Sequence, residues 1–229
     1  MQKNLQALSQ NLHQNLKISS KKSYEFLKSQ NLINIFANEA AVIAKDFPIV
    51  FITGDKSSLI AIISIDGVKN IALGKKNEWI SSYIPVSVKT HPFLTIENDK
   101  NKNERIILLD KDSDLLSEEK GKPLYTKKGE ESKYLKDIKE QLVLSSEQEL
   151  HTKKIIDMLD KSGILENGSI SNKEAEKTLI SGFKIVNRKK LYELPDSTLA
   201  SWARNGILTF IDAHLNSLIN IEKLVEKTN

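Results

Sequence analysis

The hydrophobic residues of this 229-residue chain change their spacing about half-way along the sequence. In the first half they form short runs rich in β-branched side chains, as at residues 49–53 and 59–65. In the second half they recur every three or four residues, which is the spacing of one face of a helix. This order predicts an α+β fold, with a mainly antiparallel sheet in the N-terminal half and a long helix and C-terminal helices packed on it.

A hairpin is the clearest element of the first half. Residues 49–53 and 59–65 are joined by a short polar turn, and two apolar runs around such a turn are typical of paired strands. A third strand is predicted at residues 69–73, because the turn-forming pair Asp66-Gly67 precedes it. The remaining elements predicted in this half are a helix at residues 38–45, which Pro48 ends, and strands at residues 93–97 and 105–109.

One long amphipathic helix, or two in line, is predicted at residues 133–159. Its apolar residues recur at approximately helical spacings: Leu135, Ile138, Leu142, Leu150, Ile155, Ile156 and Leu159. Gly163 is expected to end it. Beyond it we predict strands at residues 168–171 and 182–186, a helix that begins at Asp196 or Ser197 and ends near Gly206, and a last helix at residues 207–226. The last helix is expected to bury Ile211, Leu215, Leu218, Ile221 and Val225.

The first 35 residues are rich in Gln, Asn, Lys and Ser, and we expect them to form a polar N-terminal extension outside the core. Residues 36–226 are predicted to form a single α+β domain. Within that domain, the acidic and lysine-rich stretch at residues 110–133 is the best candidate for a boundary between two halves.

The charge pattern argues against nucleic-acid binding. The net charge of +4 comes from 34 basic and 30 acidic residues, and only three of the basic residues are arginine. Arginine is the side chain that grips phosphates and guanine edges in two-point contacts, and the lysines alternate with acidic residues instead of forming a basic stripe. The apolar runs are too short to cross a bilayer and the N-terminus lacks the apolar segment of a secretory signal. We therefore expect a cytoplasmic protein without membrane insertion.

The chain has no cysteine, which excludes disulfides, thiolate nucleophiles and cysteine-ligated zinc. The turn at residues 53–57 contains glycine, lysine and serine, as phosphate-binding loops do. It lacks the required glycine spacing, however, and leads into a predicted strand where a phosphate loop needs a helix. We interpret it as a plain hairpin turn and expect no cofactor.

Asp110, Asp112 and Asp114 have the alternate spacing of a calcium-binding loop. Leu115 and Gly121 stand where an EF-hand needs glycine and glutamate, which excludes that motif. A weak calcium site is the alternative to ordinary surface carboxylates, and we predict no dedicated metal site.

The four histidines lie in four different segments. His214 falls at helical spacing from Ile211 and Leu218, so it should face inward, and a hydrogen-bonded core histidine is the favoured interpretation. The alternative is a catalytic pocket in which His91 and His214 meet a carboxylate such as Asp212.

Residues 79–93 concentrate aromatic rings in a chain whose aromatic content is only 6%. One interpretation is core packing between sheet and helices, with Pro85 starting a helix and Pro92 ending it. The other is an exposed groove for a protein or peptide, because Trp and Tyr are frequent anchors in interfaces. The candidate binding residues are Trp79, Tyr83, Pro85, His91 and Phe93.

Short motifs follow one another along the chain: Phe47-Pro48-Ile49-Val50-Phe51, Trp79 with Tyr83-Ile84-Pro85, His91-Pro92-Phe93, Gly121-Lys122-Pro123-Leu124-Tyr125, Ser181-Gly182-Phe183-Lys184-Ile185-Val186, Lys190-Leu191-Tyr192-Glu193-Leu194-Pro195 and Ala213-His214-Leu215-Asn216-Ser217-Leu218. In order and spacing they resemble, over roughly residues 38–224, the SapC family of bacterial S-layer-associated proteins, and not the peptide-transporter permease of the same name. The resemblance leaves the first 35 residues outside. It implies a role beside the secretion of surface-array proteins, and it carries over no catalytic residue.

The sequence therefore predicts a non-catalytic accessory factor of S-layer or surface-protein biogenesis that binds a protein or peptide partner. The alternative is a small enzyme, or the partner of an enzyme, that acts on a peptide or surface component through the histidine and carboxylate pocket. A structural subunit of a larger assembly is a third alternative.

Overall fold

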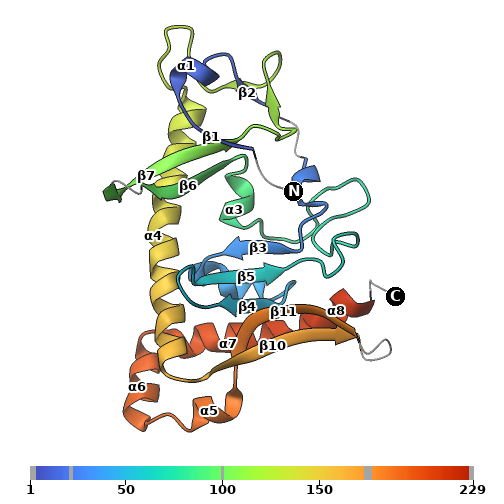
Figure 1. Cartoon of the computed structure of the whole chain (residues 1–229), viewed down its shortest axis with the longest axis vertical. Coiled ribbons are helices and arrows are strands. Elements are labelled where there is room, and N and C mark those ends of the chain that lie inside the picture. Colours follow the sequence, from blue (N-terminus) through green and yellow to red (C-terminus); the bar gives the residue numbers. More distant parts are fainter. Residues whose placement is uncertain (1–3, 21–22, 99–100, 173–176, 227–229) are drawn as a thin grey trace. The chain divides into compact units, whose positions relative to one another are not determined.

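The computed structural model describes residues 4–20, 23–98, 101–172 and 177–226 (Figure 1). The chain divides into two compact units. Unit 1 comprises Met1–Leu27, Lys75–Glu78 and Val86–Glu147, and unit 2 comprises Lys28–Gly74, Trp79–Pro85 and Gln148–Asn229. The chain thus passes between the units several times, and the residues of the long helix α4 (Lys133–Lys161) are shared between them.

Unit 1 contains two small antiparallel sheets. In one, β7 (Asn101–Asp110) lies between β1 (Leu5–Ala7) and β6 (Phe93–Asn98); in the other, β2 (Lys17–Ile18) lies between β8 (Leu116–Ser117) and β9 (Lys122–Pro123). Its short helices are α1 (Gln10–His13), η1 (Glu25–Leu27) and α3 (Val86–Lys89). The core of the unit joins Phe93 and Leu109 of the first sheet to Leu135, Ile138 and Leu142 of α4.

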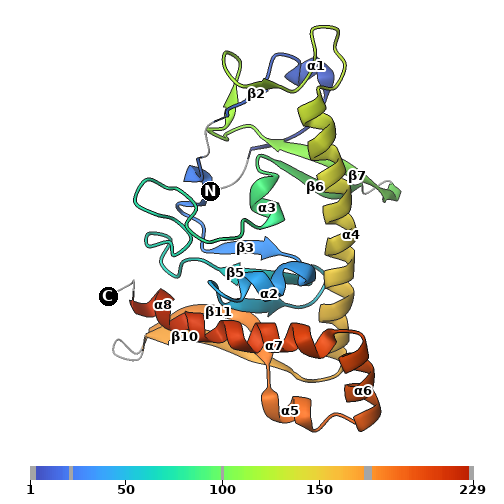
Figure 2. The ribbon, with the colours of Figure 1, turned by 180° about the vertical axis from the view of Figure 1, so that it is seen from behind.

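Unit 2 is built on a five-stranded antiparallel sheet with the strand order β10-β11-β4-β5-β3. The strands are β10 (Leu165–Asn172), β11 (Lys177–Val186), β4 (Ile49–Ile52), β5 (Ser58–Ile62) and β3 (Leu32–Ile35). The helices are η2 (Ala37–Glu39), α2 (Ala40–Ile43), α5 (Arg188–Tyr192), α6 (Asp196–Arg204), α7 (Ile207–Ser217), η3 (Leu218–Asn220) and α8 (Ile221–Glu226). Figure 2 shows α2 and α7 side by side against this sheet.

The predicted α+β class is confirmed, with antiparallel sheets mostly in the first half, one long helix and several C-terminal helices. The predicted hairpin forms as β4 and β5, in the register Ile49↔Ala61 to Ile52↔Ser58. The first predicted helix forms as η2 and α2. These elements depend on local patterns, namely β-branched runs around a turn and a proline that ends a helix.

The strand predicted at residues 69–73 is wrong. Asp66 Oδ1 accepts the backbone N–H groups of Val68 and Lys69, each at 2.8 Å, and Asn70 Oδ1 accepts that of Ala72 at 2.8 Å. These donors are thereby withdrawn from any strand ladder. The neighbour of β5 on this side is instead β3.

We expected the first 35 residues to lie outside the core, but those that the structure describes contribute to it. The part of them that the structure describes supplies a strand to each of the three sheets, and its buried apolar side chains are Ile18, Leu27, Ile33 and Ile35. Strand pairing satisfies backbone groups whatever the side chains are, so a polar segment with few apolar residues can join a sheet. The limits predicted for the domain, residues 36–226, stay a prediction.

The helical faces are also partly shifted from the predicted ones. Along α4 the inward position is taken by buried Thr152, while Leu150 is exposed. Thr152 Oγ1 accepts the backbone N–H of Ala37 at 2.9 Å, so a polar contact decides this position. Along the last helical segment Ile211 and His214 are buried as predicted, but the other buried positions include Ser217, Asn220 and Leu224.

Candidate functional site

The five candidate binding residues lie in two different environments. Trp79, Tyr83 and Pro85 belong to unit 2, whereas His91 and Phe93 belong to unit 1. Pro85, His91 and Phe93 are buried, and Trp79 and Tyr83 are half-buried. A partner would therefore meet residues 79–83, which we call the 79–83 loop.

The 79–83 loop is held by its own polar atoms and by neighbours in unit 2. The indole Nε1–H of Trp79 donates to the carbonyl oxygen of Tyr83 at 2.9 Å, which closes the loop on itself. Ser81 Oγ donates to Asp46 Oδ2 at 2.6 Å, and the Trp79 ring lies against Phe47 with 5.7 Å between ring centroids. The conformation is thus fixed while Ile80, between the two aromatic residues, stays 53% exposed.

Glu39 is a buried carboxylate that holds this loop through hydrogen bonds. Its side chain is only 2% exposed, and its Oε1 accepts the hydroxyl of Tyr83 at 2.8 Å. Its Oε2 accepts the backbone N–H of Phe36 at 2.9 Å. Burial, together with the hydrogen bond to Glu39 and its charge, raises the pKa of Tyr83 to about 12. The phenol therefore stays protonated and keeps donating to the carboxylate at neutral pH.

His91 is fixed inside unit 1. Its Nε2 lies 2.9 Å from the hydroxyl oxygen of Ser113, and its ring stacks on Phe26 with 3.6 Å between centroids and an interplanar angle of 10°. The carbonyl oxygen of the next residue, Pro92, accepts the backbone N–H of Asp110 at 3.0 Å. These contacts attach the loop after β7 to the end of the aromatic segment.

The three residues of the alternative pocket also differ in their surroundings. Asp212 is exposed on α7, whereas His214 on the same helix is completely buried. Residues two apart on a helix point to different sides, which explains the contrast. His91 belongs to the other unit.

Both ring nitrogens of His214 bind backbone groups. The backbone N–H of Val186 in β11 lies 3.1 Å from Nε2, and Nδ1 lies 2.8 Å from the carbonyl oxygen of Ile49 in β4. Because Nε2 must accept and Nδ1 must donate, the ring is the neutral tautomer with its proton on Nδ1. Burial lowers the pKa of His214 to about 4, although the hydrogen bond to Ile49 acts in the opposite direction.

His214, Ser217 and Asn220 form a buried polar seam, which we define by these three residues. Ser217 Oγ accepts the backbone N–H of Ile49 at 2.9 Å, and Asn220 Nδ2 donates to the carbonyl oxygen of Ala44 at 2.8 Å. The seam therefore satisfies backbone groups of β4, of β11 and of Ala44, the residue after α2, from one side of α7 and η3. The buried positions of Ser217 and Asn220 were not predicted; the signal that could have indicated them is their spacing of three and six residues after His214.

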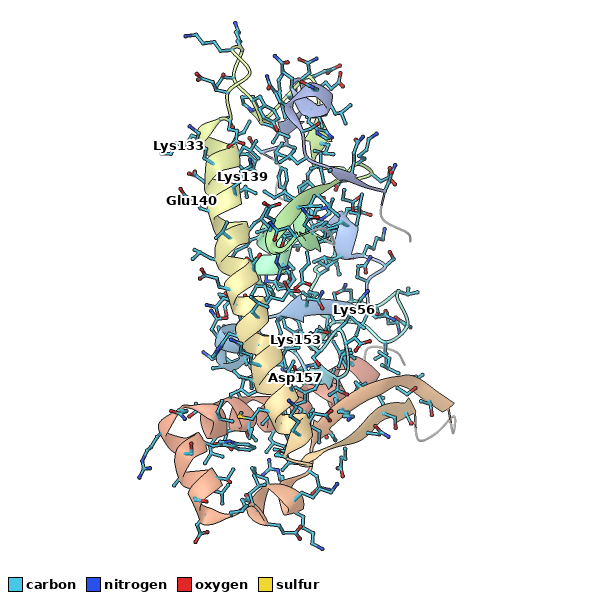
Figure 3. The ribbon with its side chains drawn as sticks, turned by 60° about the vertical axis from the view of Figure 1, so that its left-hand side comes forward. Lys56, Lys133, Lys139, Glu140, Lys153 and Asp157 are labelled. Atoms are coloured by element: carbon cyan, nitrogen blue, oxygen red, sulfur yellow. The ribbon has the colours of Figure 1, made fainter. Side chains whose placement is uncertain are left out.

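The turn between β4 and β5 is a hairpin turn, as predicted. Ser57 Oγ lies 2.8 Å from the carbonyl oxygen of Gly54 and 2.7 Å from Asp157 Oδ1 of α4. Lys153 Nζ donates to the carbonyl oxygen of Asp55 at 3.0 Å. Figure 3 labels Lys153 and Asp157 on α4 and Lys56 in the turn. These contacts dock the turn on the helix.

The carboxylates with calcium-like spacing have protein donors. Asn4 Nδ2 lies 3.4 Å from Asp112 Oδ1, and Ser23 Oγ donates to Asp114 Oδ2 at 3.0 Å. Within the described ranges, no three His, Asp or Glu side chains gather in a way that could hold a metal ion. Over the same ranges, no helix combines the length and the apolar character that a membrane span requires.

Comparison with known proteins identifies the family. The SapC family model matches residues 8–224. The chain belongs to the SapC family. The match begins at residue 8, so the segment before residue 38, which the resemblance had left outside, lies mostly within the family region. No curated protein and no solved structure matches the chain. Both the 79–83 loop and the polar seam fall inside the region that defines SapC proteins.

Proposed function

We propose that this SapC chain is a non-catalytic, cytoplasmic accessory factor of S-layer or other surface-protein biogenesis, and that it binds a protein partner through the 79–83 loop. Membership of the family supports the association with surface proteins. The observation that carries the binding surface is Ile80, which is 53% exposed between two anchored aromatic residues.

The fixed shape of the loop favours binding. Trp79 Nε1 and the Tyr83 hydroxyl are bonded within the unit, so the loop does not depend on a partner for its conformation. An ordered surface loses less conformational entropy on association than a loose one. Aromatic rings around an aliphatic side chain are also typical of the central part of protein interfaces.

Site-specific photo-cross-linking tests the proposal. A photoreactive amino acid replaces Ile80 in one variant and Ile219 in the control, since Ile219 is also an isoleucine of unit 2 and is 71% exposed. In cells of the source organism we expect position 80, and not position 219, to cross-link to a surface protein or a component of its export route. Identical products from both positions would argue against the loop. Products unrelated to surface proteins would argue against the role in biogenesis.

Substitution of Ile80 complements this test. The variant Ile80→Asp changes an exposed side chain and should leave the fold intact while the cross-linked partner is lost. The double variant Trp79→Ala, Tyr83→Ala also removes contacts with Phe47 and Glu39. Its folding must therefore be verified by circular dichroism before a loss of binding is interpreted.

The alternative function, an enzyme with a pocket of His91, Asp212 and His214, receives less support. Both nitrogens of His214 are bonded to backbone groups, and Asp212 is exposed. A general base needs a nitrogen within reach of the substrate proton. We therefore do not base the proposed function on these three residues.

A further inference from the structure

The hairpin formed by β10 and β11 is joined to the rest of its sheet in an unusual way. Among the described residues, the ladder between β11 and β4 contains one pair, Lys184↔Phe51. Continuing this antiparallel register by two residues would place Val186 opposite Ile49. The two backbone groups that would bond directly at this position are bridged by the imidazole of His214.

A single form of the imidazole can make this bridge. Nε2 must accept from the N–H of Val186, and Nδ1–H must donate to the carbonyl of Ile49. An imidazolium carries N–H on both nitrogens and cannot accept, so it would turn a donor toward the N–H of Val186. Protonation therefore breaks one of the two bonds of the bridge and leaves a charge in a completely buried site.

The ring has apolar surroundings. β4 presents Phe51, whose ring centroid is 4.5 Å from that of His214. Of the charged residues on the elements packed here, Asp212 of α7 and Asp196 and Arg204 of α6 are exposed. Lys184 of β11 pairs through its Nζ with Asp160 of α4 at 2.6 Å. None of these makes a described contact that would stabilise an imidazolium at this position.

By the number of ladder pairs, the β4–β11 boundary is the weakest place in the sheet at which that charge could reach water. The β4–β5 and β5–β3 ladders each comprise four residue pairs, and the β10–β11 ladder comprises eight. The described bonds of the His214 ring reach Val186 of β11 and Ile49 of β4, on the two sides of the β4–β11 boundary. Separation at the β4–β11 boundary disrupts a single ladder pair and exposes the ring to water, whereas separation elsewhere disrupts a longer ladder.

We propose that His214 is a proton-controlled latch, and that protonation of its imidazole releases the β10–β11 hairpin from β4 while the rest of the sheet stays paired. Because burial lowers the pKa of the ring to about 4, the latch is closed at neutral pH and opens in acid. The device lies in unit 2 and does not depend on the function proposed for the 79–83 loop.

Hydrogen exchange resolved by residue tests the latch. In the wild-type chain, the protection factor of the Val186 amide should fall about tenfold per pH unit between about pH 6.5 and about pH 4, where the released ring binds a proton and the buried ring does not, and should level off at lower pH. The amides of β5 should stay protected. In His214→Gln the Val186 amide should show no such dependence on pH. His13→Gln is the matched control, because His13 is also buried but belongs to unit 1, and it should leave the wild-type dependence unchanged.

Two outcomes would overturn the latch. One is a simultaneous loss of protection at Val186 and throughout β5, which would mean that acid only unfolds the unit. The other comes from the nitrogen NMR spectrum of the wild-type ring at neutral pH, which does not depend on any variant folding. We expect a proton on Nδ1 alone; a proton on Nε2 would exclude the bridge.

Discussion

Replacing Tyr83 with phenylalanine removes a single hydroxyl and tests how the 79–83 loop is anchored. That hydroxyl donates to Glu39 Oε1 at 2.8 Å, and Glu39 is 2% exposed. A hydrogen bond to a charged group contributes about 1.5–3 kcal/mol. Tyr83 is half-buried, so water replaces part of the lost bond, and we expect the free energy of unfolding to fall by about 1–2 kcal/mol. For a chain of this size the melting temperature should fall by about 2–8 °C.

Urea unfolding followed by circular dichroism measures this change. The matched control is Tyr192→Phe, because Tyr192 is a tyrosine of the same unit that is 73% exposed. An exposed hydroxyl contributes less than about 0.5 kcal/mol, so the control should unfold like the wild type. Equal losses in the two variants, or no loss in Tyr83→Phe, would refute the anchoring role of Glu39.

The same hydroxyl gives the loop a dependence on alkaline pH. The pKa of Tyr83 is raised from 10.0 to about 12, so between these values the unfolded chain has lost a proton that the folded chain keeps. The contribution of Tyr83 to stability is therefore complete below about pH 10 and declines as the pH rises toward 12. Tyr83→Phe should remove this part of the alkaline decline, whereas Tyr192→Phe should retain it.

Three further changes test other parts of the structure. Ser57→Ala removes the hydroxyl that binds Asp157 and should cost about 1 kcal/mol in urea unfolding; an unchanged midpoint would show that the contact between Ser57 and Asp157 does not stabilise the turn. Gly121→Ala places a Cβ 2.2 Å from the carbonyl oxygen of Ile18 at a residue with φ +128°, so thermal unfolding should reveal a loss above about 2 kcal/mol. For His214 the pKa is lowered from 6.5 to about 4, so the unfolded chain binds the proton first as the pH falls. The contribution of His214 to the free energy of unfolding should be fully present above about pH 6.5 and should fall by about 3 kcal/mol by pH 4. Urea unfolding at a series of pH values measures this change, and a wild-type profile equal to that of His214→Gln would contradict it.

The elements that were predicted correctly are those whose signal lies in the spacing of residues within one segment. The hairpin of β4 and β5 was found from β-branched runs around a turn, and α4 was found from its helical spacing. The failed strand at residues 69–73 has the composition of a strand, but Asp66 and Asn70 bind the backbone donors next to them. Whether such a side chain binds its own backbone or faces solvent depends on the surrounding turn, which a hydrophobic pattern does not encode.

The candidate site was predictable only in part. The helical spacing of His214 correctly placed it inside, and the concentration of rings at residues 79–93 indicated a structured segment. The partners of His214 lie 28 and 165 residues away in the sequence, and the Ser113 partner of His91 lies 22 residues away. No spacing rule connects residues so far apart, so the assignment of His91 and His214 to one pocket rested on residue type alone.

The polar seam shows why the apolar face of the last helical segment was misplaced. A pattern that counts apolar residues puts Leu215 and Leu218 inside, yet both are only half-buried while Ser217 and Asn220 are buried. At the start of β4, the N–H and carbonyl groups of Ile49 are bonded by Ser217 and His214. A buried backbone group without a partner costs about 1–3 kcal/mol, whereas a half-buried leucine still keeps part of the contribution that full burial would give. The sheet therefore selects the polar stripe of α7 and η3 as its inner face, and the leucines take the flanks.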